Sequence, residues 1–127
     1  MRVEKDYLAR FIALRDYLRL HEPPTTEIEP PPKGLADYLA AGFARFGGRV
    51  ALVRLTAREY NRLRRYHANL LEDVWMTSMR EGLVGRLWGA FVTYDQGQPL
   101  DSFSLVSEPE EGVSRVATFA LPRAVRD

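Results

Sequence analysis

The clearest pattern in the chain begins at residue 49, where an apolar run of strand length leads into a helical period. The length and β-branched content of residues 49–55, RVALVRL, predict a short buried strand. Thr56 and Glu59 follow with the spacing of a capping box, in which each side chain satisfies a backbone N–H at a helix start. A strand and then a helix that begins after Thr56 are therefore expected.

Helical periodicity continues well beyond this start. Apolar side chains recur at three- or four-residue spacing, and no glycine or proline interrupts residues 56–81. The positions of this face are Tyr60, Leu63, His67, Leu70, Leu71 and Val74. We predict one amphipathic helix over residues 56–75, about five turns long.

Two helices are predicted before this unit. Residues 3–21 carry an apolar stripe between charged positions, and residues 34–46 form a shorter amphipathic helix that Gly47 and Gly48 end. The segment between them, residues 22–33, reads EPPTTEIEPPPK. Five of these twelve residues are proline, which excludes a helix or a central strand and favours an extended polyproline II conformation.

Strand patterns dominate the rest of the chain. Residues 84–94, VGRLWGAFVTY, predict a strand in which Gly89 marks a bulge or a close approach of another backbone. Alternating polar and apolar residues predict two more strands at 102–107 and 114–121. This order predicts an α+β fold in which residues 34–127 form one domain, with antiparallel hairpins packed on the long helix.

The proline-rich segment 22–33 leaves two interpretations of the first helix open. In one, the segment is a surface loop that joins two helices of one compact body. In the other, it is a stiff spacer that holds helix 1–21 away, so that this helix packs on a neighbouring subunit. The apolar residues that would make the second contact are Tyr7, Phe11, Leu14 and Leu18.

Composition narrows the classes of function. The net charge of +1 argues against a protein whose main task is to coat nucleic acid or an anionic membrane. Of the 18 basic residues only Lys5 and Lys33 are lysine, and arginine suits interfacial ion pairs. Zero cysteine excludes disulfides, and together with eight prolines it is typical of thermophile usage or of a GC-rich genome. Without a signal peptide or membrane span, a cytoplasmic or virion protein is expected.

Charged and aromatic side chains supply the candidate contact residues. The exposed face of the predicted helix 56–75 is basic, which is explained either by solvation and ion pairing or by a protein or nucleic-acid partner. The acidic turn at residues 108–111 is either exposed to solvent or paired with an arginine across an interface. Trp88 either packs in the core or makes a subunit contact. The residues assigned to such an interface are Arg58, Arg62, Arg65, Trp88, Glu110 and Glu111.

No residue pattern marks catalysis. His21 and His67 lie on different predicted elements without carboxylates at ligand spacing, so no metal site is expected. A nucleophile elbow, a phosphate-binding loop and a dinucleotide fingerprint are all absent from the sequence. We therefore expect a protein that is not an enzyme and binds no cofactor.

The strand and helix start resemble two known families. Residues 55–60, LTAREY, are similar to the strand-to-helix junction of response-regulator winged-helix domains. In that family a turn and a recognition helix soon follow, whereas helical periodicity here continues to Val74. The likeness is therefore attributed to shared capping chemistry.

The second resemblance spans residues 49–107. An apolar strand, a helix that starts TAREYNRL, a connector and the segment 85–95, GRLWGAFVTYD, together resemble the axial domain of tailed-phage major capsid proteins and of encapsulin shell proteins. A full capsid subunit also has an extended loop and a spine helix, for which 127 residues leave no room, so a reduced, axial-domain-only type is implied. The resemblance implies self-assembly into rings or a closed shell.

Two functional hypotheses result. In the first, the protein is a structural, self-assembling subunit whose partners are its own copies, with enclosed cargo or nucleic acid as a possible content and no membrane contact. In the second, it is a small regulatory or nucleic-acid-binding module that uses the arginine-rich helix 56–75. The near-neutral net charge favours the first.

Overall fold

The computed structural model describes residues 2–123, with the side chains of residues 5–123. Met1 and residues 124–127, which the predicted first and last segments include, lie outside the described residues. The strands are β1 (Thr25–Thr26), β2 (Val50–Leu55), β3 (Leu71–Glu72), β4 (Leu83–Leu87), β5 (Ala90–Tyr94), β6 (Ser102–Ser107) and β7 (Val116–Ala120). The helices are α1 (Arg2–Leu20), α2 (Leu35–Phe46), α3 (Ala57–Tyr66), the 3₁₀ turn η1 (Ala68–Leu70) and α4 (Met76–Met79).

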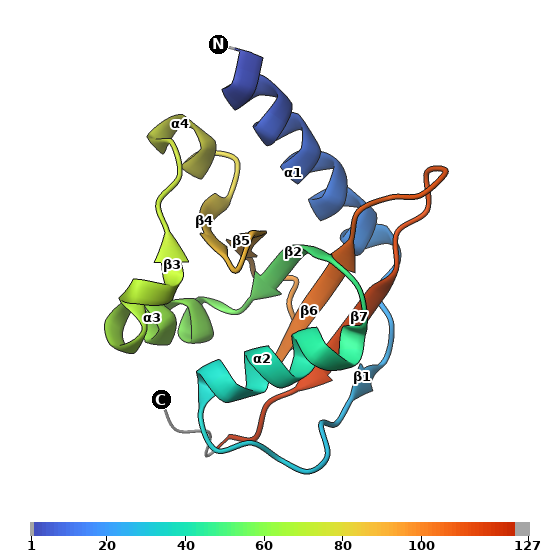
Figure 1. Ribbon diagram of the computed structural model, residues 1–127, viewed down its shortest axis with the longest axis vertical. Helices are drawn as coiled ribbons and strands as arrows, with labels where there is room; N and C mark the ends of the chain where they lie inside the picture. The colour runs from blue at the N-terminus through green and yellow to red at the C-terminus, as the bar shows by residue number, and fades with distance from the viewer. Residues whose placement is uncertain (1, 124–127) are drawn as a thin grey trace.

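The strands of the described chain form one seven-stranded mixed sheet in the order β1-β7-β6-β2-β5-β4-β3 (Figure 1). Strand β2 lies at its centre, parallel to β5, with Leu52 beside Phe91, and antiparallel to β6, with Val53 opposite Leu105. All residues of β2 are buried, because helices cover both faces of the sheet here, and this explains its continuous apolar run. The predicted α+β class is confirmed.

Helices α2 and α3 cover one face of the sheet. Leu39 of α2 and Leu63 of α3 are fully buried and share a core with Val53 and Phe103. Figure 1 shows α2 lying across β6 and β7. A Cβ atom at Gly42 would lie 2.6 Å from the Phe103 ring, so this glycine allows α2 to approach the sheet closely.

Helix α1 covers the other face. Phe11 and Leu18 are 0% exposed and Leu14 is 3% exposed, and all three belong to a second core that includes Leu52 and Phe91. The expectation that this helix is an arm for a neighbouring subunit is therefore corrected, because its own sheet already covers the apolar stripe.

The proline-rich segment 22–33 is a loop of the same body, as the first interpretation held. Thr25–Thr26 adds strand β1 to the edge of the sheet, parallel to β7. Ile28 is 4% exposed and joins the core under α2. Glu22, at the start of the segment, forms an ion pair with Arg54 of β2. The segment is thus attached to the sheet by pairing, packing and charge.

The predicted helix 56–75 is wrong beyond residue 66. Helix α3 ends at Tyr66, and the backbone of His67 leaves the helical region with φ −135° and ψ 36°. The chain then forms η1 and strand β3, in which Leu71 lies opposite Leu87 of β4. An apolar pair such as Leu70 and Leu71 fits a helix or a strand equally well, and here pairing with β4 decides the outcome.

The predicted strand 84–94 is two strands, β4 and β5, joined by a tight turn. Trp88 and Gly89 have φ values of 49° and 85°, the positive-φ pattern of a type I′ hairpin turn. Gly89 is therefore a turn residue and not a bulge inside a strand. The Trp88 ring packs edge to face on Phe43 of α2, with ring centroids 5.2 Å apart. This contact supports a backbone conformation that is unusual for a bulky residue.

Candidate functional site

Helix α3 carries a basic outer face next to the central strand. The helix begins after Thr56, whose Oγ1 accepts a hydrogen bond from the backbone N–H of Glu59 at 3.4 Å, one half of the predicted capping box. Tyr60 and Leu63 are buried against the sheet and fix the rotation of the helix. The basic side chains on the remaining positions are Arg58, Arg62, Arg64 and Arg65.

Two of these arginines lie over tyrosine rings. The Arg64 guanidinium lies 6.0 Å from the ring centroid of Tyr60, and that of Arg65 lies 5.5 Å from the ring centroid of Tyr66. Both arginines are exposed, so each keeps its charge at the surface while its side chain rests on an aromatic face.

The predicted acidic turn is the tip of the hairpin between β6 and β7. Backbone hydrogen bonds of 2.8 and 3.0 Å join Glu110 and Val113 in both directions. Glu111 and Gly112, which lie between them, have positive φ values, as in a tight two-residue turn. The turn holds Glu110 and Glu111 exposed at the end of the hairpin.

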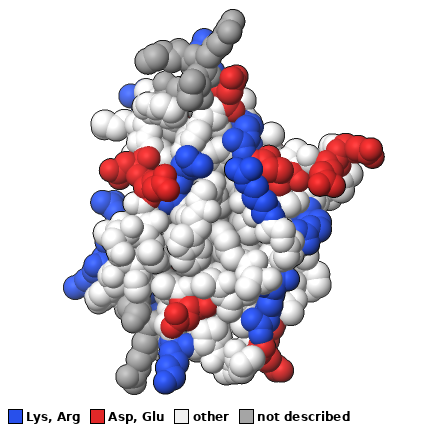
Figure 2. Space-filling model, in the orientation of Figure 1, with Lys and Arg blue, Asp and Glu red and all other residues white. Residues whose placement is uncertain are grey.

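The basic helix and the acidic tip lie on opposite sides of the molecule. In Figure 1, α3 lies at the left, and the loop between β6 and β7 projects at the upper right. Figure 2, in the same orientation, shows acidic side chains gathered on that projection. Glu108, at the base of the tip, forms an ion pair with Arg10 of α1. A contact between the α3 arginines and Glu110 and Glu111, which is predicted for a subunit interface, would therefore join two different chains.

The other residues assigned to an interface do not form one surface. Tyr7 packs edge to face on Phe91, with centroids 4.8 Å apart, and on Trp75, with centroids 5.2 Å apart. Burial raises the pKa of the Tyr7 phenol. Trp88 is 45% exposed but packs on α2, across the sheet from α1. The remaining three, on α1, are core residues: Phe11, Leu14 and Leu18.

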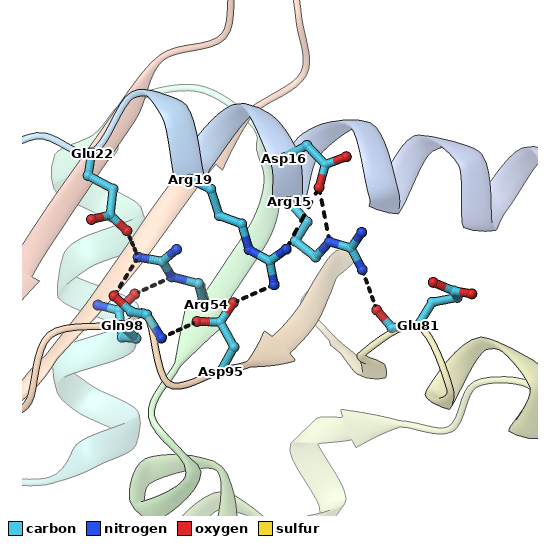
Figure 3. A network of polar contacts seen from close by, with 9 residues as sticks. Arg15, Asp16, Arg19, Glu22, Arg54, Glu81, Asp95 and Gln98 are labelled. Carbon is cyan, nitrogen blue, oxygen red and sulfur yellow. Dashed lines mark hydrogen bonds and ion pairs between the residues drawn. The ribbon is translucent and has the colours of Figure 1, made fainter.

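Arg54 is a buried charged residue that the sequence pattern did not single out as a candidate site. Although charged, it is 1% exposed, on the α1 side of β2. Its Nε donates to Gln98 Oε1 at 2.7 Å, and its Nη2 donates to Glu22 (Figure 3). Beside this cluster, Arg19 of α1 pairs with Asp95 at 3.2 Å. A charged residue inside an apolar strand was the available signal, and the contacts show that Arg54 joins β2 to segment 22–33 and to the loop after β5.

A pocket of about 430 Å³ opens at the start of α3, where that helix meets the loop between β5 and β6. Glu59 lines it and is 2% exposed, and Oε2 of its carboxyl has no hydrogen-bond partner within the described part of the chain. Burial is the largest cause that raises the pKa of this carboxyl. In the sequence, Glu59 is recognisable only as part of the capping box, and the periodicity of α3 does not indicate a buried acid.

The two histidines lie near the ends of different helices. His21 stacks on Tyr17, with ring centroids 4.1 Å apart, and its Nδ1 lies 3.0 Å from the Tyr17 carbonyl oxygen. His67 is half-buried, and its Nε2 has no hydrogen-bond partner among the residues described.

Within residues 2–123, no group of three or more histidine or acidic side chains is placed to hold a metal ion. No helix in that same range is both long enough and apolar enough to cross a membrane. Comparisons with protein-family models, curated proteins and solved structures give no match for the chain.

Proposed function

We propose that the protein is a non-catalytic structural subunit that associates head to tail with copies of itself. In this contact the arginines of α3 in one copy meet the acidic hairpin tip of the next. The observation that carries the proposal is the exposure of complementary charges on opposite sides of one chain. The resemblance of residues 49–107 to shell-forming axial domains points to the same kind of function.

Such a contact is heterologous, because two different surfaces of the same chain meet. Copies joined in this way form a ring or a closed shell when the rotation between them closes, and a filament when it does not. Arginine suits the basic side because its planar guanidinium can bind a carboxylate through two parallel hydrogen bonds. The near-zero net charge means that approaching copies experience little overall repulsion.

The proposal replaces the arm contact of the sequence-based hypothesis. Deleting residues 1–33 cannot test it, because α1 and Ile28 belong to the core and their loss would unfold the protein. The test must change surface charge and leave both cores intact. Arg64 and Arg65 on one side, and Glu110 and Glu111 on the other, meet this condition, since all four are exposed.

The experiment is size-exclusion chromatography with light scattering at two salt concentrations. Exposed charges are weakly screened at about 50 mM salt and strongly screened at about 500 mM. We expect wild type to associate at low salt, and both Arg64→Glu/Arg65→Glu and Glu110→Arg/Glu111→Arg to reduce its mass to that of the monomer. Arg80→Glu, another exposed arginine, is the matched control and should behave as wild type. A monomeric wild type at low salt, or variants that keep the full assembly, would contradict the proposal.

The basic face of α3 also defines the competing function, nucleic-acid binding. Titration of a fluorescent DNA duplex into wild type and into Arg64→Glu/Arg65→Glu, over the same salt range, separates the two. Salt-sensitive binding that the double variant abolishes, in a wild-type protein that stays monomeric, would establish the competing function and refute self-association.

A further inference from the structure

The two charged surfaces of the proposed contact each carry an exposed apolar side chain. Tyr66, the last residue of α3, is 52% exposed and follows directly after Arg65. Val113, on the acidic hairpin tip, is 63% exposed. Single exposed apolar residues are common on protein surfaces. Here, however, one stands beside the charges on each of the two surfaces that are proposed to meet.

Glu110 and Val113 lie on the same face of the hairpin tip. They form an antiparallel bridge, in which the backbone N–H of each donates to the carbonyl oxygen of the other at 2.8 and 3.0 Å. Residues directly opposite each other in an antiparallel pair point their side chains to the same face, with Cβ atoms about 5 Å apart. A partner that binds the Glu110 carboxylate from this face therefore meets Val113 as well.

Arg65 and Tyr66 form the matching pair at the end of α3. The Arg65 guanidinium lies 5.5 Å from the ring centroid of Tyr66, so the charge and the ring are presented side by side. The backbone N–H of His67 donates to the Leu63 carbonyl oxygen at 2.8 Å and closes the last turn, in which both residues lie. A carboxylate that reaches Arg65 thus approaches the Tyr66 ring at the same time.

The base of the hairpin tip is held from both faces of the sheet. On one face, Glu108 forms an ion pair with Arg10 of α1. On the other, Nη1 of Arg115 donates to the Phe46 carbonyl oxygen at the end of α2 at 2.7 Å, and its guanidinium lies 4.4 Å from the Phe46 ring centroid. These contacts orient the tip before any partner binds, which lowers the entropic cost of association.

We propose that Val113 of one copy packs on the Tyr66 ring of the next and forms the apolar centre of the head-to-tail contact, with an ion pair between Glu110 and Arg65 beside it. This inference rests on the proposed function, because it assigns residues to the same two surfaces. Interfaces commonly combine an apolar centre with a polar rim, and tyrosine is enriched among the residues that dominate binding energy.

The charges and the apolar pair have different tasks. The ion pair orients the approaching copies and is screened by salt, whereas the contact between Val113 and Tyr66 adds affinity that salt does not screen. One valine and one tyrosine bury far less than the roughly 1,200–2,000 Å² of stable interfaces, so this pair alone does not hold copies together at high salt.

Substitutions of exposed residues in the whole 127-residue chain test the contact by sedimentation velocity at about 50 mM salt. Val113→Thr keeps the β-branched shape and replaces a methyl group by a hydroxyl, so association should weaken about three- to tenfold. Tyr66→Ser removes the ring and should weaken association about tenfold or more, whereas Tyr66→Phe keeps the ring and should associate as wild type. Leu100→Thr, at an 86% exposed position outside both surfaces, is the matched control and should also associate as wild type.

The salt dependence separates an apolar contact from a general loss of charge pairing. The fold-loss caused by Val113→Thr should be the same at about 50 and about 150 mM salt, whereas the fold-loss caused by Glu110→Gln should shrink at the higher salt. A Val113→Thr loss that shrinks in parallel with that of Glu110→Gln would contradict an apolar contact at Val113.

A double-mutant cycle shows whether the two residues touch across the contact. If they do, Val113→Thr/Tyr66→Ser should weaken association by clearly less than the product of the two single losses. Losses that multiply, or single variants that associate as wild type while charge reversal still disrupts the assembly, would overturn this inference and leave the proposed function standing. A wild type that is monomeric at about 50 mM salt would refute both.

Discussion

Replacement of Phe11 by alanine tests whether α1 belongs to the body of its own chain. The Phe11 ring is completely buried, lies edge to face on Phe91 with centroids 6.1 Å apart, and has the Arg15 guanidinium 5.8 Å from its centroid. If α1 were an arm that docks on another subunit, truncation of this ring would leave the stability of the isolated chain nearly unchanged.

The structure sets the size of the effect. A buried aromatic side chain removes roughly 150–250 Å² from water, and at about 25 cal/mol per Å² this corresponds to roughly 4–6 kcal/mol. The alanine that replaces it keeps part of this burial, and the cavity collapses only partly. We therefore expect Phe11→Ala to lower the free energy of unfolding by about 3–5 kcal/mol.

The assay is urea unfolding followed by tryptophan fluorescence, at two protein concentrations tenfold apart. Leu20→Ala, at the exposed end of the same helix, is the control and should change stability by less than about 0.5 kcal/mol. In about 500 mM salt, which screens the proposed association between copies, the midpoint should not depend on protein concentration, because both sides of the α1 contact lie in one chain. A Phe11→Ala protein as stable as wild type, or a midpoint that rises with concentration, would refute the intrachain packing of α1.

Three further substitutions test how contacts of buried residues contribute to the stability of the protein. Arg54→Leu removes the partner of Gln98 and of Glu22, and should cost about 2–3 kcal/mol in urea unfolding, since Glu22 stays partly in water; a neutral effect would show that the pair contributes nothing. Gly42→Ala, although alanine favours helices, should destabilise the protein by about 1–3 kcal/mol because its Cβ meets the buried Phe103 ring, and a gain in stability would contradict that contact. Glu59→Gln should stabilise the protein at pH 7, since burial raises the pKa of Glu59 above its unfolded value and the folded state disfavours the ionised form. Thermal unfolding should show the gain shrinking as pH falls to the unfolded pKa of Glu59, and a gain that grows toward acid would be the wrong sign.

Elements with strong local signals could be predicted from the sequence. Apolar periodicity and the glycine pair at Gly47 and Gly48 placed α2, and an alternating pattern placed β6 at the bounds that the structure has. The start of α3 was found through the spacing of Thr56 and Glu59. In each case the residues that determine the element lie within it or next to it.

The failures all depend on distant contacts. Residues beyond Tyr66 keep a helical period, and only pairing with β4 makes Leu71 part of a strand. The turn at Trp88 was missed because its positive φ value is stabilised by Phe43, far away in sequence, and a tryptophan is not a usual turn residue.

For the same reason, the two charged surfaces could be predicted from the sequence, whereas the pocket could not. Charge pattern alone located the basic face of α3 and the exposed acidic turn, because both consist of neighbouring residues. The pocket was not foreseen, since the β5–β6 loop must fold against the first turn of α3 to bring Tyr94 and Leu100 beside Glu59.

Mixing two single-surface variants tests head-to-tail association most directly. Arg64→Glu/Arg65→Glu keeps the acidic tip, and Glu110→Arg/Glu111→Arg keeps the basic helix, so each alone should be monomeric by sedimentation velocity at low salt. In an equimolar mixture the unaltered tip of one variant can meet the unaltered helix of the other, and the two altered surfaces are also opposite in charge. We predict that the mixture sediments as a larger species and returns to monomers at high salt. A mixture that remains monomeric, while wild type associates under the same conditions, would contradict the account.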